Sequence, residues 1–170
     1  MDLQEVIKRP RENFCSFVPK TQTLNKDREY FISESFFIKR DFNKARAAKE
    51  AEFLKKLQDF TYFPKFIELN EYRGFSEIIM GKIDGKSIEN LKDTLNLQER
   101  LIVCSGLLSI FNTLRQLKIV HGDINESNLL YNREKQLLFL IDFEYAVFED
   151  SDRDLTGPNW GVYHIFNYLK

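Results

Sequence analysis

The segment 97–119 (LQERLIVCSGLLSIFNTLRQLKI) is the feature that most limits how this chain can fold. Its apolar residues lie almost all round a helix rather than along one stripe, and a helix of that kind is normally buried. We therefore expect a long central helix with the other elements of this part of the chain packed around it. Cys104 is expected in the core because it lies in this apolar stretch, and its spacing from Cys15 does not suit a metal site.

The segments before this helix predict a small sheet and one further helix. Residues 29–42 (EYFISESFFIKRDF) are rich in aromatic and β-branched side chains and predict two short strands or a hairpin. Residues 43–60 consist of strong helix formers, with Asn43 as a plausible N-cap. Residues 62–83 (YFPKFIELNEYRGFSEIIMGKI) then predict a strand, a turn at Arg73-Gly74 and a second strand.

The segments around and after the long helix are shorter. Residues 81–87 (GKIDGKS) place two glycines in a polar stretch directly after a strand, which is typical of a joint between two parts of a fold. Residues 87–95 predict a short helix. Residues 128–132 and 137–143 predict two short strands joined by the turn REKQ, and a last helix is expected from about Trp160.

This order of elements predicts a single α+β domain over residues 1–170, divided into two lobes. Residues 1–80 would form a small β-rich first lobe, 81–85 a hinge, and 86–170 a mostly helical second lobe. The formal net charge of −1 gives no reason to expect nucleic acid as a partner. We see no signal peptide and no apolar run of the ~18 residues that a transmembrane segment needs, so the expected location is the cytoplasm.

The polar stretch HGDINESN, residues 121–128, carries residue types that phosphoryl transfer requires. That reaction needs a carboxylate to orient or deprotonate the attacking hydroxyl group, oxygen ligands for Mg²⁺, and a fixed cation near the phosphates. Asp123 supplies a carboxylate, and Asn128 and Asp142 supply oxygen atoms of the kind that Mg²⁺ prefers. A β-hairpin between Asn128 and Asp142 would bring them together. The simpler alternative is that Asp123 is only a turn residue.

A cation for the phosphates is available earlier in the chain. Lys39 ends the strand SFFI, and either Glu50 or Glu52 in the next helix could hold it in an ion pair. Glu50 is the preferred partner, because Phe53 and Leu54 then occupy the apolar positions three and four residues later. The alternative is that Lys39 is a surface lysine at the end of a strand.

Taken together, HGDINESN and LIDFE resemble the catalytic loop and the metal-binding motif of the protein-kinase-like superfamily. The resemblance covers roughly residues 29–165. It implies a two-lobed kinase-like fold and a protein that uses ATP and Mg²⁺. It implies that Asp123 is the catalytic base and that Asn128 and Asp142 are Mg²⁺ ligands. It also implies that Lys39 contacts the ATP phosphates and that Glu50 is the ion-pair partner of this lysine.

The segment IIMGKI, residues 78–83, resembles the adenine-binding hinge of this superfamily. The resemblance implies that Met80 lies at the gate of the adenine site and that Gly81 to Ile83 offer backbone hydrogen bonds to the nucleotide. It also implies that His121 supports the catalytic loop from beneath; the alternative is that His121 is a general base.

Three departures from the protein-kinase pattern affect the expected function. No glycine precedes Gly74, so the glycine-rich loop is missing, and another segment such as TQTLNK (21–26) would have to cover the phosphates or leave them open. Gly122 stands where regulated protein kinases carry the Arg that reads a phosphorylated activation loop, so such control is not expected. Glu144 replaces the last glycine of the metal-binding motif, which is similar to aminoglycoside, choline and lipopolysaccharide kinases, whereas HGD also suits RIO-like kinases.

The sequence therefore predicts a compact kinase, a phosphotransferase whose acceptor is an alcohol group. The acceptor would be a protein Ser/Thr or a saccharide, as in atypical Ser/Thr protein kinases or glycan and lipopolysaccharide kinases. Since the sequence stops at Lys170, we expect a shortened second lobe. Its acceptor site would be small, formed by the loop EDSDRD (149–154) and the last helix, or completed by a partner chain. The rival interpretation, favoured by the missing glycine-rich loop, is a pseudokinase or nucleotide-binding partner protein without catalysis.

Overall fold

The computed structural model describes residues 15–16 and 27–149 of the 170-residue chain. In chain order its elements are β1 (Cys15–Ser16), β2 (Arg28–Ile32), β3 (Phe36–Asp41), α2 (Lys44–Leu57), β4 (Phe66–Glu71), β5 (Ser76–Gly81), β6 (Lys86–Ser87), α3 (Ile88–Leu91), the 3₁₀ helix η2 (Lys92–Thr94), α4 (Leu97–Gln116), β7 (Ile119–Val120), β8 (Leu129–Asn132), β9 (Leu137–Leu140) and β10 (Val147–Phe148). The α+β class is confirmed, whereas the predicted segment 21–26 and the helix from Trp160 lie outside the described residues.

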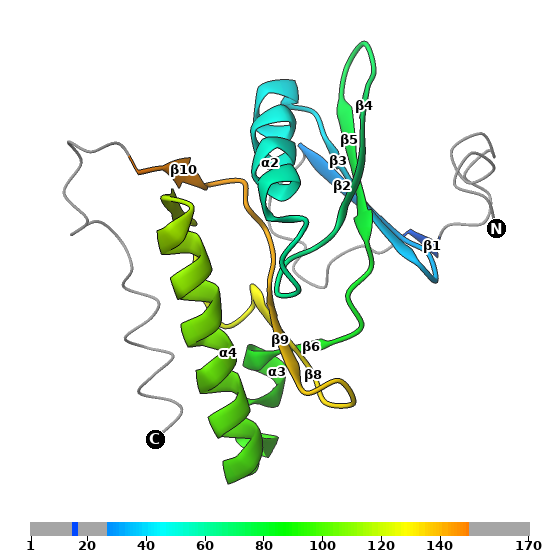
Figure 1. Ribbon diagram of the computed structural model, residues 1–170. Coiled ribbons are helices and arrows are strands. Elements are labelled where there is room, and N and C mark those ends of the chain that lie inside the picture. Colours follow the sequence, from blue (N-terminus) through cyan, green and yellow to red (C-terminus); the bar gives the residue numbers. More distant parts are fainter. Residues whose placement is uncertain (1–14, 17–26, 150–170) are drawn as a thin grey trace.

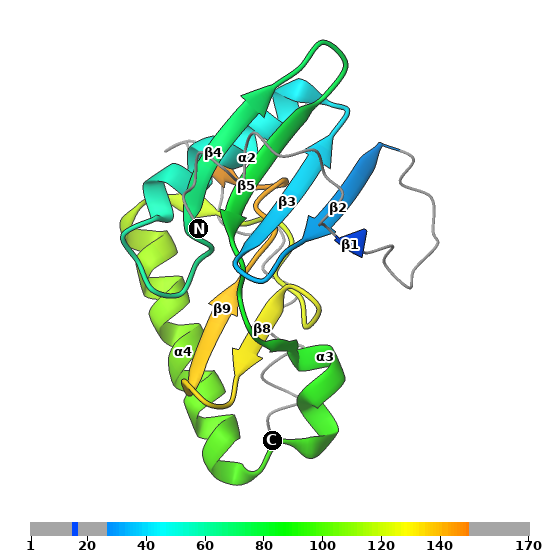
Figure 2. The same ribbon diagram turned by 90° about the vertical axis from the view of Figure 1, so that its right-hand side faces the viewer.

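An antiparallel five-stranded sheet with the order β1-β2-β3-β5-β4 forms the first part of the fold (Figure 2). The segment 29–42 is a hairpin, in which β2 and β3 pair with Tyr30 opposite Lys39. Lys39 is also paired with Ile78 of β5, so the lysine lies on an interior strand and not at the surface. The turn between β4 and β5 forms at Arg73-Gly74 as expected, closed by a 2.9 Å hydrogen bond from the Tyr72 amide to the Phe75 carbonyl.

Helix α2 packs against one face of this sheet (Figure 1). The side chain of Asn43 accepts a 3.1 Å hydrogen bond from the Arg46 amide, which confirms the expected N-cap. One face of the helix is buried, and it includes Ala47, Leu54 and Leu57 together with Glu50 and Phe53. A carboxylate in that buried face requires a partner of opposite charge, since an unpaired buried charge is costly.

Helix α4 begins with a capping box, in which Asn96 and Glu99 satisfy each other's backbone amides. The helix packs against β9 of the β8–β9 hairpin (Figure 1). The predicted strands 128–132 and 137–143 correspond to this hairpin, where Leu129 pairs with Leu140, although the second strand ends at Leu140 and not at residue 143. Among the described residues, no helix has both the length and the apolar character needed to cross a membrane.

The prediction that α4 is buried all round is wrong for the described part of the chain. Leu97, Leu101 and Leu108 are 74%, 57% and 54% exposed and lie on one face of the helix. Among the described residues, the elements that contact α4 lie on the opposite face. Cys104 is partly buried rather than in the core. The helix also ends at Gln116, because the chain adopts a positive φ at Lys118 and enters β7 at Ile119.

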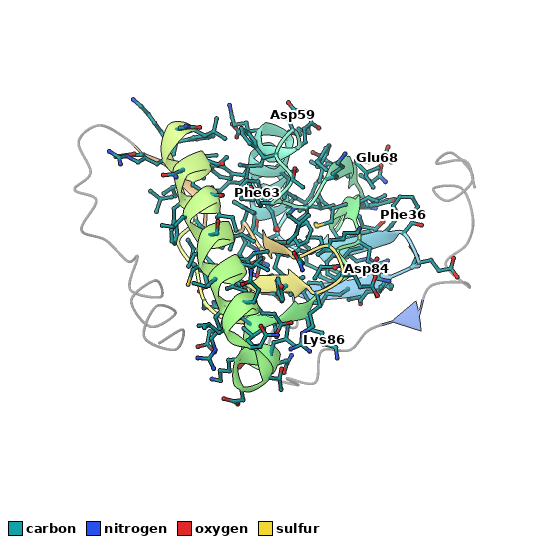
Figure 3. All side chains as sticks on the ribbon, turned by 60° about the horizontal axis from the view of Figure 1, so that its bottom comes forward. Phe36, Asp59, Phe63, Glu68, Asp84 and Lys86 are labelled. Carbon is teal, nitrogen blue, oxygen red and sulfur yellow. The ribbon has the colours of Figure 1, made fainter. Side chains whose placement is uncertain are left out.

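One hydrophobic core joins the sheet and α2 to α4 and the hairpin. The rings of Phe63 and Phe143 meet edge to face at 5.7 Å, and Phe143 packs in the same way on His121 at 4.6 Å. Figure 3 places Phe63 among the side chains between α4 and the rest of the molecule, and it is buried. The polar segment 121–128 therefore lies on a packed apolar core. Strand β5 ends at Gly81 and β6 begins at Lys86, but the division into lobes at 81–85 stays a prediction.

Candidate active site

Lys39 is the central cation of the site, and its side chain is only 3% exposed. Its Nζ lies 2.8 Å from Glu50 Oε2 and 2.7 Å from Asp142 Oδ1. The ion pair therefore forms with Glu50, whereas Glu52 is exposed. The helix period explains the choice, because residue 50 shares the sheet-facing side of α2 with Leu54 and Leu57.

Burial and charge act against each other in this pair. Burial lowers the pKa of Lys39, but Glu50 and Asp142 outweigh it and hold the pKa above its usual range. Burial raises the pKa of Glu50, and only the nearby ammonium group opposes that rise. The lysine is accordingly charged at neutral pH, and it is the group that opposes protonation of Glu50.

Glu144 is a third acid in the cluster, and it is buried. Its Oε2 lies 3.2 Å from Lys39 Nζ and 2.6 Å from Arg28 Nη1. Carboxylate oxygens of Glu50, Asp142 and Glu144 all lie within 4.8 Å of one another, a set that could hold a divalent cation. From the sequence, Glu144 was noted only as a departure from the motif. Arg28 was not predicted, because no motif in the neighbouring sequence indicates that it belongs to the site.

Asp123 is held by two side-chain amides from its own loop. Asn125 Nδ2 donates to Asp123 Oδ1 at 3.0 Å, and Asn128 Nδ2 donates to both Oδ2 and the carbonyl of Asp123 at 2.9 Å. Asn125 Oδ1 in turn accepts from the amides of Ser127 and Asn128 at 3.0 and 3.1 Å. This turn fixes the direction of the Asp123 carboxylate, which has an unused lone pair on each oxygen for a further partner.

His121 supports this loop and is not placed as a base. Its Nδ1 accepts from the Asp123 amide at 3.2 Å, so the proton must be on Nε2, which donates to the Ile141 carbonyl at 3.0 Å. Burial lowers the pKa of His121, which favours this neutral form. Both ring nitrogens are occupied by the backbone, which leaves none to take a proton from a substrate.

Asn128 and Asp142 are brought together by the β8–β9 hairpin. The amide of Ile141 donates to the carbonyl of Asn128 at 3.0 Å. Residue 142 therefore directly follows a residue that is hydrogen-bonded to Asn128. Asp142 has a φ of 67°, a left-handed conformation that turns its side chain out of the strand alternation and toward Lys39. No described residue donates to Asn128 Oδ1, so that oxygen is open to a cation, and the donor set suits Mg²⁺.

The predicted hinge needs one correction. The amide of Gly81 donates to the Lys65 carbonyl at 2.8 Å, and the amide of Lys82 donates to the Ser35 carbonyl at 2.9 Å. These two N–H groups are therefore not available to a nucleotide, which leaves the carbonyl of Gly81 and the backbone of Ile83. Met80 is buried in β5, where it pairs with Phe37 and Phe66.

A cavity of about 570 Å³ lies beside the hinge but is separate from the charged cluster. Asp59, Phe63 and Asp84, which Figure 3 labels, are among its lining residues, as are Gly81 and Ile83. None of the predicted catalytic, phosphate-binding or metal-binding residues lines it. Its volume therefore says nothing about the site of chemistry, which we place by the contacts of the side chains.

Comparison with known proteins assigns this chain to a family. The family model of the RIO domain matches residues 2–168. The chain belongs to the RIO domain family. This membership confirms the kinase-like fold that the motifs HGDINESN and LIDFE predicted.

Two curated relatives of this RIO domain match part of it. The KEOPS complex subunit Bud32 of Pyrococcus abyssi is 31% identical over 109 residues, which cover 64% of this chain and 48% of that protein. Protein kinase OspG of Shigella flexneri is 29% identical over 90 residues, or 50% of this chain and 44% of OspG. The chain thus spans about half the length of these two relatives.

Solved structures agree on the fold. The Cydia pomonella granulovirus kinase PK-1 aligns with a TM-score of 0.66 at 20% identity, over 85% of this chain and 57% of PK-1. WbdD aligns with a TM-score of 0.60 at 18% identity, over 85% of this chain and 35% of WbdD. At such low identity these structures support the fold alone.

Proposed function

We propose that this RIO-domain chain is an ATP- and Mg²⁺-dependent kinase that transfers a γ-phosphoryl group to a hydroxyl group. One observation carries the proposal: the residues that the reaction needs are connected in a single chain of contacts. Asn128 donates to Asp123, its carbonyl is bonded to the residue before Asp142, and Asp142 contacts Lys39. A fold kept only for its shape would not need these four side chains together.

Each residue would have a separate task. Asp123 would accept the hydrogen bond of the acceptor hydroxyl and direct its oxygen toward the phosphorus atom. Asn128 Oδ1 and the Asp142 carboxylate would hold Mg²⁺, which neutralises charge on the phosphates when bound. Lys39, kept charged and aligned by Glu50, would contact the phosphates. Met80, the Gly81 carbonyl and Ile83 would border the adenine.

The acceptor we propose is a protein Ser/Thr, with a saccharide as the second candidate. A protein acceptor is supported by the name of one relative, protein kinase OspG. The name of another relative, KEOPS complex subunit Bud32, describes a protein that works within an assembly. This supports a partner chain that completes the acceptor site. The loop 149–154, the other proposed contributor, lies almost wholly outside the described residues.

The test is phosphotransfer from labelled ATP to the chain itself, to casein and to lipopolysaccharide, with and without Mg²⁺. We expect Asp123→Ala to lower the rate by about 10²–10⁴-fold, the usual contribution of a positioned acid or base. Asp142→Ala should abolish the increase in the phosphotransfer rate that Mg²⁺ causes. Asp93→Asn is the control, because this acid is exposed on η2 and should leave the rate unchanged. A wild-type rate equal to that of both alanine variants would refute the proposal.

A pseudokinase is the second candidate, and one contact favours it. Lys39 and Asp142 are joined directly at 2.7 Å, so Mg²⁺ must compete with the ammonium group for that carboxylate. The two candidates differ in the Asp123→Ala variant. For a nucleotide-binding protein without catalysis, Mg-ATP would raise the Tm of wild type and of Asp123→Ala equally, while no phosphotransfer would be detected in either.

A further inference from the structure

Arg28 is a second buried cation beside Lys39, and neither the motifs nor the family comparison assigns it a role. It begins β2, and its side chain is 7% exposed. Because Tyr30 pairs with Lys39 and Arg28 pairs with Asp41, the alternation of β2 places Arg28 on the same face of the sheet as Lys39. Its Nη1 lies 2.6 Å from Glu144 Oε2, the oxygen that also contacts Lys39.

The two cations differ in how many of their donors are free. An ammonium group has three N–H bonds, and Lys39 Nζ already has three carboxylate oxygens around it, at 2.7, 2.8 and 3.2 Å. A guanidinium group has five N–H bonds in a planar fork. No described residue accepts a hydrogen bond from Arg28 Nε, although Asp41 Oδ2 lies 3.8 Å away. Arg28 therefore has a buried, unsatisfied N–H group beside the cluster, whereas the Lys39 ammonium group is surrounded by carboxylates.

The position of the Arg28 guanidinium group is relevant because this chain has no glycine-rich loop to contact the phosphates. No glycine precedes Gly74, so the chain lacks the glycine-rich loop whose backbone covers the phosphates in protein kinases. Arg28 follows the segment where that loop would lie, and its guanidinium group shares one carboxylate oxygen with Lys39. A planar guanidinium fork suits two phosphate oxygens at once.

We propose that Arg28 is a second phosphate-binding cation of this nucleotide site, and that Glu144 holds its guanidinium group in place. The inference rests on the proposed function only as far as nucleotide binding, and not on transfer. Glu144, at the end of the motif LIDFE, is then a positioning residue, since it acts on the nucleotide through Arg28. The competing explanation is that Arg28 merely neutralises the buried Glu144 carboxylate.

The experiment is calorimetric titration with adenosine, ADP and ATP in the presence of Mg²⁺. The double variant Arg28→Gln/Glu144→Gln removes both charges, so that no unpaired charge is left buried and the fold is preserved. We expect its affinity for ATP to fall about 10- to 100-fold, as for the loss of a hydrogen bond to a charged group, with little change for adenosine. Glu144→Gln alone keeps the Arg28 guanidinium group but removes its charged partner, so its ATP affinity should lie between those of wild type and the double variant. Arg73→Gln, at an exposed turn, is the matched arginine control.

The outcomes separate this inference from the proposed function. An ATP-to-adenosine affinity ratio that is the same in the double variant and in wild type would overturn the role of Arg28. The Mg²⁺-dependent site would then still be supported if Asp142→Ala lost ATP binding. A Glu144→Gln variant that reproduces the full loss of the double variant would also overturn it, because Arg28 is intact there. If wild-type protein binds no nucleotide, both the inference and the proposed function fail.

Discussion

The side-chain amide of Asn125 donates to the Asp123 carboxylate at 3.0 Å, and its oxygen accepts from the backbone amides of Ser127 and Asn128. One residue thus orients the proposed catalytic carboxylate and closes the turn toward the proposed metal ligand. A small displacement of a reacting group lowers the reaction rate, because the reaction requires the reacting atoms to be aligned.

We therefore predict that Asn125→Ala lowers kcat for phosphotransfer by roughly 10- to 100-fold with little change in the KM for ATP. Ser127→Ala is the control, because the Ser127 hydroxyl only donates to Asn125 and touches no proposed catalytic group. Steady-state kinetics on both variants would decide the matter. Equal rates for wild type and Asn125→Ala would show that Asp123 is oriented without this amide.

Lys39 is the only described cation that contacts both Glu50 and Asp142, at 2.8 and 2.7 Å. We predict that Lys39→Met lowers the free energy of unfolding by about 3 kcal/mol, the usual cost of breaking a buried ion pair from one side. The carboxylates of Glu50 and Asp142 are then freed, and together with Glu144, which stays paired with Arg28, they should bind a divalent cation. MgCl₂ should accordingly raise the Tm of the variant more than NaCl of the same ionic strength does.

The exposed Lys44 provides the comparison for this experiment. Its Nζ lies 3.4 Å from Glu71, and both side chains are largely in solvent. Lys44→Met should change the free energy of unfolding by less than about 1 kcal/mol, as for other surface ion pairs. A Mg²⁺ response that is no larger in Lys39→Met than in Lys44→Met would contradict the predicted cation binding.

Gly122 has a φ of 83°, and a Cβ atom there would lie 2.8 Å from the Tyr145 carbonyl oxygen. Both features penalise any side chain, so we predict that Gly122→Ala lowers the free energy of unfolding by about 2 kcal/mol. A Cβ at Gly74 meets nothing within 4 Å, and Gly74→Ala should stay within about 1 kcal/mol of wild type. Urea unfolding of both variants measures the difference. Equal stability would mean that the segment around Tyr145 moves aside at no cost.

Burial lowers the pKa of His121 below its ordinary value in an unfolded chain, about 6.5. The unfolded state therefore binds this proton more readily, so stability is lost as the pH falls below about 6.5, until it passes the folded-state pKa. We predict that the urea midpoint of wild type drops more between pH about 7.5 and 5.5 than that of His121→Gln, which cannot take up the proton. A parallel drop in both proteins would assign the pH effect to other groups.

Much of the fold followed from local patterns. The glycine-bearing turn at Arg73-Gly74, the N-cap Asn43 and the strands 128–132 and 137–143 depend on residues near each other in the chain, so they could be predicted. The same holds for the pairing of Lys39 with Glu50 rather than Glu52, because the helix period puts Glu50 on the buried side. For α4 the pattern was insufficient, since apolar residues all round a helix do not reveal whether both faces are covered.

The sequence by itself determined the order of elements and the spacing of Asp123, Asn128 and Asp142, because strand, turn and helix signals act over a few residues. Only the tertiary structure decided that Arg28 meets Glu144 and that the hinge amides of Gly81 and Lys82 are already bonded. These contacts join residues that are distant in sequence. No local preference encodes them, because they exist only once the sheet and the β8–β9 hairpin have packed against each other.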